Sequence, residues 1–400
     1  MDYLSKRVKS MEESATLAMT SKSRELACQG LDVINLSIGE PDFNTPEFIK
    51  EAGKKAIDEN YTHYPPVPGY QDLREAICLK LKRDNLLEYK PNQIVVSTGG
   101  KQALANCILS IVNPADEVII PVPYWVSYTE LVKLAEGEPV FIKANVEKDF
   151  KITAQQLEQA ITPRTRLLIF NSPNNPSGSV YSWEELKSLA EVLSRHPQVF
   201  IISDEIYEYI IFTGKHESLA SFPELKDRVA LINGVSKGYA MTGWRLGYVA
   251  AHREIAEACN KIQGQITSAT SSISQRAALA AMLRSPNETP EIQQMVSAFH
   301  HRRDLVLNLL KEIPQIKTNT PQGAFYIFAD FSAFFGKSDG KHQIINGDDL
   351  CMYLLEKALV ALVPGSAFGD PNCLRISYAT SENNLIRAVQ RIKEALTVLH

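Results

Sequence analysis

Short apolar runs alternate along the chain with longer segments that have the spacing of amphipathic helices. The clearest runs lie at residues 94–96, 117–120, 167–170, 199–202, 229–232 and 246–250. Their apolar character is continuous rather than alternating, which indicates strands buried on both faces. Helical segments lie between them, for example residues 100–111 and 183–194, and the second follows Ser182, a suitable N-cap. This order predicts an α/β fold with a parallel sheet between helices.

The pattern changes after Pro286. A long charged helix is expected at residues 291–310, followed by a strand at 323–328, a helix at 348–357, a strand at 374–378 and a terminal helix. Because 400 residues exceed one average domain, we predict two. A large domain is expected at residues 47–290, and a small α+β domain at 1–46 and 291–400.

Composition argues for an ordinary soluble enzyme. The chain is 44% apolar and 22% charged, with a net charge of −4 and no basic run, so neither nucleic acid nor an anionic membrane is an expected partner. The N-terminal residues lack the apolar core of a signal peptide, and no segment is long and apolar enough to span a bilayer. The six cysteines include no C-x-x-C pair, which favours reduced thiols in the cytoplasm.

Lys237 lies among small, turn-forming residues in the segment 234–245, and Arg245 follows it eight positions later. An amine that can form a Schiff base, close to an arginine that can bind a phosphate bidentately, is what pyridoxal phosphate requires. A single lysine is most often a solvated surface group, so the interpretation depends on the rest of the chain.

Functional residues of open α/β sheets gather where strands end. Gly99 and Gly100 follow the first predicted strand and lead into a helix, where they suit either an anion or a plain tight turn. Asp204 follows another strand, and could keep a pyridine nitrogen protonated or cap a helix. Tyr207, three residues later, could bond the phenolic oxygen of the cofactor. Nucleotide-binding glycine motifs are absent, since no Ser or Thr follows Lys101.

Three further residues carry weaker signals. Asn175 lies in a proline-rich turn after residues 167–170, which suits either an accurately placed side chain or a turn alone. Trp125 could stack on a planar cofactor or be a core residue. Arg375, inside an apolar strand, could bind a substrate α-carboxylate or form a structural ion pair.

Together these motifs closely resemble the class I aminotransferases of the pyridoxal phosphate fold type I group, in particular bacterial aspartate aminotransferases of subgroup Ib. The match runs from residues 14–16 through 37–43 to 375–380, and the five segments that carry it are residues 99–104, 123–128, 171–178, 203–207 and 236–248. The resemblance implies a mostly parallel seven-stranded sheet and a homodimer with shared active sites. It also implies transfer of the amino group of L-aspartate to 2-oxoglutarate, which gives oxaloacetate and L-glutamate.

The resemblance further implies a role for each matching residue. Lys237 corresponds to the lysine that holds pyridoxal phosphate and moves the proton, and Asp204 to the partner of the ring nitrogen. The remaining matches are Asn175 and Tyr207 at the ring oxygen, Trp125 and Ile206 at the ring faces, Gly99, Gly100 and Arg245 at the phosphate, Tyr64 reaching the partner subunit's phosphate, Gly39 and Arg375 at the α-carboxylate, and Lys101 with Thr16 at the side-chain carboxylate of aspartate.

Two positions depart from the family pattern. Gly234 stands where many relatives have a serine that bonds the phosphate, and Glu12 stands where members that also use prephenate have a basic residue. Glu12 would repel the second carboxylate of prephenate. An aspartate/prephenate, aromatic or alanine aminotransferase, or a carbon–sulfur lyase, remains the alternative. A ligand-sensing transcription regulator would need a preceding basic helix-turn-helix module, for which the match leaves no room.

Overall fold

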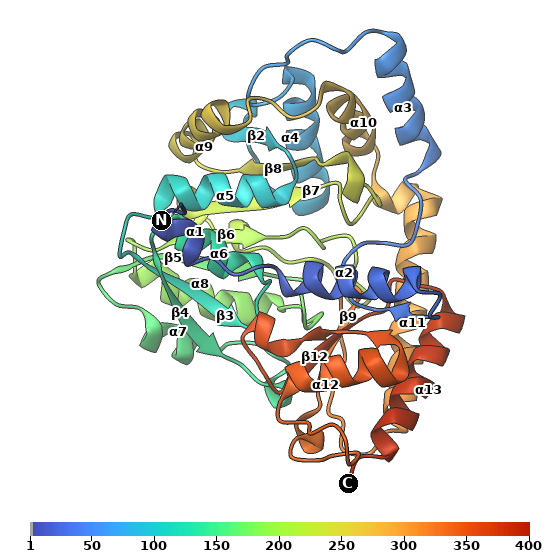
Figure 1. Cartoon of the computed structure of the whole chain (residues 1–400). Coiled ribbons are helices and arrows are strands. Elements are labelled where there is room, and N and C mark those ends of the chain that lie inside the picture. Colours follow the sequence, from blue (N-terminus) through green and yellow to red (C-terminus); the bar gives the residue numbers. More distant parts are fainter. Residues whose placement is uncertain (1–2) are drawn as a thin grey trace.

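A seven-stranded sheet forms the centre of the larger part of the chain in the computed structural model, which describes residues 3–400 (Figure 1). The strand order is β2-β8-β7-β6-β5-β3-β4, and all neighbours are parallel except β8, which is antiparallel to β2 and β7. The strands are β2 (Ile94–Ser97), β3 (Glu117–Val122), β4 (Glu138–Lys143), β5 (Thr165–Asn171), β6 (Phe200–Asp204), β7 (Val229–Gly234) and β8 (Gly247–Ala250). The predicted mostly parallel sheet is confirmed.

Strand β4 has no counterpart among the apolar runs of the sequence. It pairs only with β3 and is the edge of the sheet. Its residues include Pro139 and the half-exposed Phe141, and only Ile142 is buried. Because an edge strand needs neither two apolar faces nor a complete set of N–H donors, it lacks the continuous run that marks the buried strands.

Helices cover both faces of this sheet, as Figure 1 shows for α5 on one side and α8 on the other. One face packs its apolar residues against α5, α6 and α9, and the other face packs against α4, α8 and α10. Ser182 accepts a bond from the backbone N–H of Glu185 at the start of α8, so the predicted N-cap is confirmed. The helices are α3 (Glu47–Asp58), α4 (Gln71–Asn85), α5 (Gly100–Ile111), α6 (Ser127–Leu134), α7 (Ala154–Ala160), α8 (Trp183–Arg195), α9 (Arg253–Ile266) and α10 (Ser272–Leu283).

A three-stranded antiparallel sheet, in the order β11-β12-β9, forms a smaller unit that we call the small lobe. Its strands are β9 (Tyr326–Asp330), β11 (Val363–Pro364) and β12 (Cys373–Ser377), and its helices are α11 (Pro290–Leu310), α12 (Gly347–Tyr353) and α13 (Glu382–Thr397). The predicted start of the strand at residue 323 is wrong. Ala324 has a φ of +56°, and Gly323 makes only an isolated bridge to Ile211, so regular pairing begins at Tyr326.

The predicted helix at 348–357 also needs a correction. Helix α12 ends at Tyr353, and residues Leu354–Ala358 form a single π-helical turn that ends at Leu359, which has a φ of +53°. Such a turn has the same apolar spacing over a few residues as an α-helix, so the sequence pattern does not distinguish the two.

In the N-terminal segment, α2 (Ala15–Cys28) lies beside the small lobe, whereas α1 (Lys6–Lys9) lies beside α6 of the large-sheet part, where Arg7 pairs with Glu136 (Figure 1). Strand β1 (Ile34–Asn35), which follows these helices, pairs in parallel with β10 (Val360–Ala361). One apolar core contains residues of the large sheet and of the small lobe together. None of the helices between residues 3 and 400 is both long and apolar enough to cross a membrane.

Candidate active site

A cavity of about 280 Å³ lies between the carboxyl ends of the large sheet's parallel strands and the small lobe. Most of the residues singled out from the sequence line it: Thr16, Gly39, Gly100, Lys101, Trp125, Asn175, Asp204, Ile206, Tyr207, Lys237, Arg245 and Arg375. Gly99 lies directly against Arg245 at its border. Tyr64 does not line it, and is 98% exposed. Segments from the whole length of the chain therefore converge at one place.

Lys237 follows β7 and points into this cavity. Its Nζ donates a 2.5 Å hydrogen bond to the backbone oxygen of Gly39. Burial lowers the pKa of Lys237 to about 8, since the surroundings disfavour the charged amine. A lysine with such a pKa has an appreciable neutral fraction at physiological pH, which a nucleophile or a general base needs.

Asp204 is the last residue of β6 and is buried. Its Oδ2 accepts a 2.8 Å bond from the hydroxyl of Tyr128, and its Oδ1 accepts a 3.3 Å bond from the N–H of Ile206. Burial raises the pKa of Asp204 to about 6, and the hydrogen bonds from Tyr128 and Ile206 together with the charge of Lys237 offset only part of this effect. A turn rather than a helix follows, so the alternative of a helix N-cap is wrong.

Tyr128 was not singled out from the sequence. It lies in the first turn of α6, three residues after Trp125, and is only 1% exposed. The ring of Trp125 packs edge-on against it at 5.6 Å. A buried tyrosine next to a predicted stacking tryptophan was the available signal, because a buried hydroxyl needs a polar partner.

The two glycines at the start of α5, which we call the glycine cradle, differ in their packing: a Cβ at Gly100 would meet only ordinary contacts at 3.7 Å or more, whereas Gly99 has no room for a side chain. Gly99 has a φ of +83°, and a Cβ there would lie 2.5 Å from Nη2 of Arg245. Arg245 is held by a 2.8 Å bond from its Nη1 to the backbone oxygen of Thr242. The arrangement places a helix N-terminus and a guanidinium at the same spot, which suits a phosphate group.

The structure also explains Gly234. A Cβ at this position would lie 2.7 Å from the Cα of Gly247 in the neighbouring strand β8, so a serine does not fit. Ser236, two residues later, lines the cavity and offers a hydroxyl there.

Arg375 is the most unusual cation of the cavity, since it is only 2% exposed and has no carboxylate partner among residues 3–400. Its Nη1 donates to Oδ1 of Asn175 at 3.0 Å and its Nη2 to the backbone oxygen of Ser37 at 2.6 Å. Its Nε is buried without a partner. The alternative of a structural ion pair is wrong, and the unbalanced charge calls for an anion.

Lys101 is a second cation of the cavity, on the large-sheet side. Its Nζ lies 4.9 Å from the centre of the Trp125 ring, and no carboxylate pairs with it in the described part of the chain. Thr16, from α2, lines the same cavity. A molecule with two carboxylates would meet one cation from each side.

Two more residues of the cavity had no signal in the sequence pattern. Asn171, at the end of β5, donates from Nδ2 to the backbone oxygen of Asp204 at 2.8 Å and accepts from the N–H of Asn175 at 2.9 Å. Tyr326, on β9, has its hydroxyl 2.9 Å from the hydroxyl of Tyr207. Both connect predicted site residues to one another.

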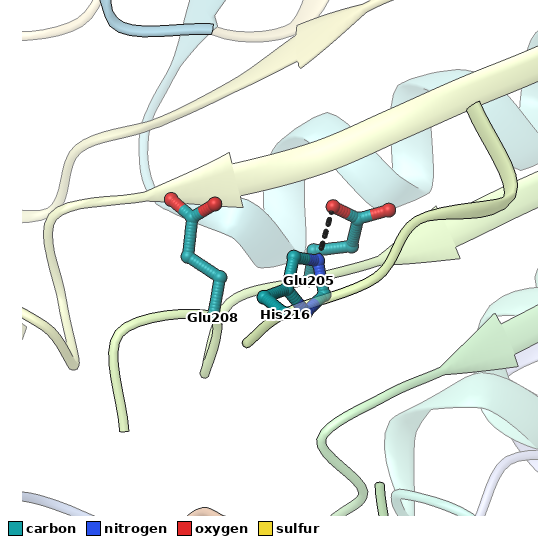
Figure 2. Close-up of side chains that lie close together, drawn as sticks. All are labelled: Glu205, Glu208 and His216. Carbon is teal, nitrogen blue, oxygen red and sulfur yellow. Dashed lines mark hydrogen bonds and ion pairs between the residues drawn. The ribbon is translucent and has the colours of Figure 1, made fainter. Parts of the chain in front are cut away.

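Behind the cavity lies a buried cluster of Glu205, Glu208 and His216, whose ligand-type atoms are within 4.8 Å of one another (Figure 2). The imidazole bonds the Glu205 carboxylate at 2.7 Å. Glu208 pairs with the buried ammonium of Lys80 and accepts a bond from Asn85. Because Lys80 pairs with Glu208, His216 pairs with Glu205 and both carboxylates accept further hydrogen bonds, the cluster is explained as an internal ion-pair network rather than a metal site.

The donor set of the cavity fits pyridoxal phosphate. The glycine cradle with Arg245 suits its phosphate, Asp204 its pyridine nitrogen and the amine of Lys237 its aldehyde. The partnerless Nε of Arg375 leaves capacity for the carboxylate of an amino acid.

Comparison with known proteins agrees with this chemistry. A family model described as aminotransferase class I and II matches residues 31–392. A protein of Petunia hybrida named bifunctional aspartate aminotransferase and glutamate/aspartate-prephenate aminotransferase is 48% identical over 99% of this chain and 83% of its own. A Cereibacter sphaeroides protein named aspartate/prephenate aminotransferase is 48% identical over 98% of both chains.

Solved structures agree as well. The crystal structure of an aspartate aminotransferase from Rhizobium meliloti superimposes with a TM-score of 0.95, at 43% identity and over 100% of both chains. An aspartate aminotransferase from Thermus thermophilus, solved with maleate, gives a TM-score of 0.93 at 39% identity, over 99% of this chain and 100% of the other.

Proposed function

Since the chain belongs to the class I and II aminotransferase family, we propose that it transfers the amino group of L-aspartate to 2-oxoglutarate, yielding oxaloacetate and L-glutamate. The observation that carries the substrate choice is that two cations, Arg375 and Lys101, remain without carboxylate partners in the described chain once Arg245 is assigned to the phosphate. They line one cavity from the small lobe and from α5. Both substrates are dicarboxylates, so each cation would receive one carboxylate. An aminotransferase for alanine or aromatic amino acids has no need of the second cation, because those side chains carry no carboxylate.

The cofactor is pyridoxal phosphate, which supplies an aldehyde carbon for the amino group and a ring that withdraws electrons from the α-carbon of the substrate. We propose that Gly99, Gly100 and Arg245 hold its phosphate and that Asp204 bonds its ring nitrogen. Asp204 would keep that nitrogen protonated, because an anion in a buried site favours the charged form of a neighbouring base. Tyr128 supports this role, since its hydroxyl stabilises the ionised Asp204.

The remaining walls of the cavity position the ring. Asn175 and Tyr207 would donate to the ring oxygen, while Trp125 and Ile206 would cover the two faces. These contacts would fix the plane of the ring relative to Lys237 and the substrate.

Lys237 would hold the cofactor at rest and act as general base once the substrate displaces it. Its Nζ would take the proton from the α-carbon and could return it to the carbon from which the amino group of the cofactor hangs. The lowered pKa of this amine, about 8, leaves an appreciable neutral fraction for the first step. Water would then hydrolyse the C=N bond to the substrate, which releases the ketoacid and leaves the nitrogen on the cofactor, and 2-oxoglutarate would take up the amino group in the reverse sequence.

Two proposals concern the setting of the enzyme. Tyr64 is 98% exposed and outside the cavity of its own chain, which supports a homodimer in which it reaches the phosphate of the partner site. All six cysteines are unpaired, including Cys107 and Cys259 with their sulfurs 3.6 Å apart, which supports the reducing cytoplasm.

The first experiment is a visible absorption spectrum of the protein loaded with pyridoxal phosphate, before and after addition of L-aspartate alone. Conversion of the cofactor to its amine form, with release of oxaloacetate, would support the proposal. A spectrum that L-aspartate leaves unchanged but L-alanine or L-phenylalanine converts would contradict the substrate assignment. Lys237→Ala, which lacks the base, is the negative control and should give no conversion.

Prephenate as a further amino acceptor is the second candidate, and the names of the relatives support it. Glu12 argues against it. The residue is exposed, and its backbone N–H donates to the carboxylate of Glu130 at 2.8 Å, so two acidic residues lie next to each other here. Glu12→Lys should raise kcat/KM for prephenate relative to oxaloacetate, while Glu13→Lys serves as the matched control. Equal effects of the two variants would remove Glu12 from substrate selection.

A further inference from the structure

Tyr326 connects two parts of the site that come from different lobes. It is fully buried on β9, and its hydroxyl lies 2.9 Å from the hydroxyl of Tyr207, which follows β6 in the large-sheet part. On β9 and β12, Tyr326 pairs with Ser377 and Arg375 pairs with Phe328, so Tyr326 and Arg375 lie on the same face of the small sheet. The guanidinium carbon of Arg375 is 4.6 Å from the centre of the Tyr326 ring.

We propose that Tyr326 is a positioning residue that orients the hydroxyl of Tyr207 and links it to the carboxylate-binding Arg375. Its hydroxyl donates to the oxygen of Tyr207, which directs the single Tyr207 proton to the ring oxygen of the cofactor. Its ring supports the guanidinium that receives the substrate carboxylate. This inference rests on the proposed function, in which Tyr207 bonds the ring oxygen.

The count of protons supports the direction of the bond. A tyrosine hydroxyl has one proton to donate, and the two hydroxyls share a single contact in which either oxygen can be the donor. If Tyr207 gives its proton to the cofactor, Tyr326 must give its own to Tyr207. Donors joined in such a chain polarise one another, so Tyr207 becomes a stronger donor.

The surroundings hold the Tyr326 hydroxyl in place. A Cβ added to Gly39 would lie 2.8 Å from this oxygen, so the backbone of Gly39 packs directly against it. The backbone oxygen of the same glycine accepts the bond from Lys237. Tyr207 is the hydrogen-bond partner of Tyr326, and the charged groups that act on Tyr326 are Arg375 and Glu40. A phenylalanine would keep the ring contact with Arg375 but leave Tyr207 without a donor.

The arrangement also links substrate binding to the cofactor. A carboxylate that neutralises Arg375 changes the electrostatic field at the stacked Tyr326 ring. The change therefore also reaches the hydrogen bond between the hydroxyls of Tyr326 and Tyr207. By linkage, the state of the ring oxygen then changes the affinity for the carboxylate to the same extent. Maleate, a dicarboxylate that has no amino group to transfer, is a suitable probe.

The test is a spectrophotometric pH titration of the enzyme loaded with pyridoxal phosphate, without substrate and with maleate. A weaker Tyr207 donor stabilises the negative ring oxygen less, so the cofactor–lysine group keeps its proton to higher pH. We expect Tyr326→Phe to raise the pH of the spectral transition by about 0.5 unit and Tyr207→Phe to raise it further. Tyr326→Phe should also reduce the shift that maleate causes, whereas Tyr326→Leu, which removes the stacked ring, should additionally weaken maleate binding several-fold.

Tyr378→Phe is the matched control, since Tyr378 is equally buried and its hydroxyl donates to the backbone of Ala324, outside the cavity. Its spectral transition should stay at the wild-type pH. If Tyr207→Phe shifts the transition and Tyr326→Phe leaves both it and the maleate effect at wild-type values, the role of Tyr326 is overturned. If Tyr207→Phe shifts nothing, the assignment of Tyr207 to the ring oxygen fails as well. Melting temperatures of the cofactor-free variants identify any loss of folding.

Discussion

The guanidinium of Arg375 fixes the orientation of the Asn175 side chain across 200 residues of sequence, since Nη1 donates a 3.0 Å bond to Oδ1. With its carbonyl oxygen used in this way, the amide can offer only its Nδ2 hydrogens to the cavity. A cofactor ring oxygen is an acceptor, so this orientation is the one that the proposed role of Asn175 requires. The same bond joins the small lobe to the turn after β5.

The glycine cradle can be tested with Gly99→Ala. The added Cβ would meet Nη2 of Arg245 at 2.5 Å, at a φ of +83° that alanine disfavours by about 1 kcal/mol. We expect at least a tenfold weaker affinity for pyridoxal phosphate, measured by fluorescence or equilibrium dialysis. Gly243→Ala is the control, because nothing lies within 4 Å of its Cβ position. Equal affinities of the two variants would contradict a phosphate site at Gly99.

Tyr128→Phe removes the hydroxyl that bonds Asp204 at 2.8 Å. A hydrogen bond to a buried charged group contributes about 1.5–3 kcal/mol, so we expect kcat for aspartate to fall by about tenfold or more. KM for aspartate should change little, since Tyr128 contacts neither Lys101 nor Arg375, the cations proposed to bind the substrate carboxylates. Steady-state kinetics measure both constants. Tyr353→Phe, which removes a hydroxyl bonded to Ala395 in the small lobe, should leave kcat unchanged.

Lys101→Gln tests the recognition of the second carboxylate. Loss of one charge-assisted bond should lower kcat/KM for aspartate by roughly 10- to 100-fold, while kcat/KM for alanine, which lacks that carboxylate, should change less than about threefold. Half-reaction kinetics with the two amino acids give these ratios directly. Lys187→Gln, an exposed lysine on α8, is the control for loss of a positive charge. Parallel losses for aspartate and alanine would exclude side-chain recognition by Lys101.

The lowered pKa of Lys237 makes a prediction for the cofactor-free protein. Its pKa is about 8 in the folded chain and 10.5 in the unfolded one, so the stability it contributes is complete above pH 10.5 and is lost as the pH falls to 8. Lys237→Met removes this titration, so at pH 7 its free energy of unfolding, measured with urea, should exceed that of the wild type by about 2 kcal/mol. This difference in free energy of unfolding between the variant and the wild type should disappear towards pH 10. A difference independent of pH would show that Lys237 is not desolvated.

The strand ends of the site could be predicted from the sequence because they follow a general rule of parallel sheets. Gly99, Asn175, Asp204 and Lys237 each come two to five residues after a buried apolar run, and the structure brings all four to the cavity or its border. Arg375 was found by a different signal, a charge inside an apolar strand. Local pattern and charge were therefore sufficient for these positions.

The partners of these residues could not be predicted in the same way. Tyr128 and Asp204 are 76 residues apart, and Tyr207 and Tyr326 are 119 apart, so their contacts depend on how α6 and the small lobe pack. Phe325 and Tyr326 are neighbouring aromatics in one apolar segment, and only the register of β9 with β12 determines which of them faces Arg375. The start of β9 was misplaced for a related reason, because the positive φ of Ala324 has no local signature.

Besides Lys237 and Arg245, the cavity has two cations that belong to different parts of the fold: Lys101 is on a helix that packs against the large sheet, and Arg375 is on β12 of the small lobe. Aspartate and glutamate differ in length by one methylene group, yet one site must accept both during each cycle. A small displacement of the lobe changes the span between the two cations without altering the groups around Lys237. We therefore predict that the junction between the lobes limits the range of dicarboxylate lengths accepted, and that variants which stiffen this junction should narrow that range.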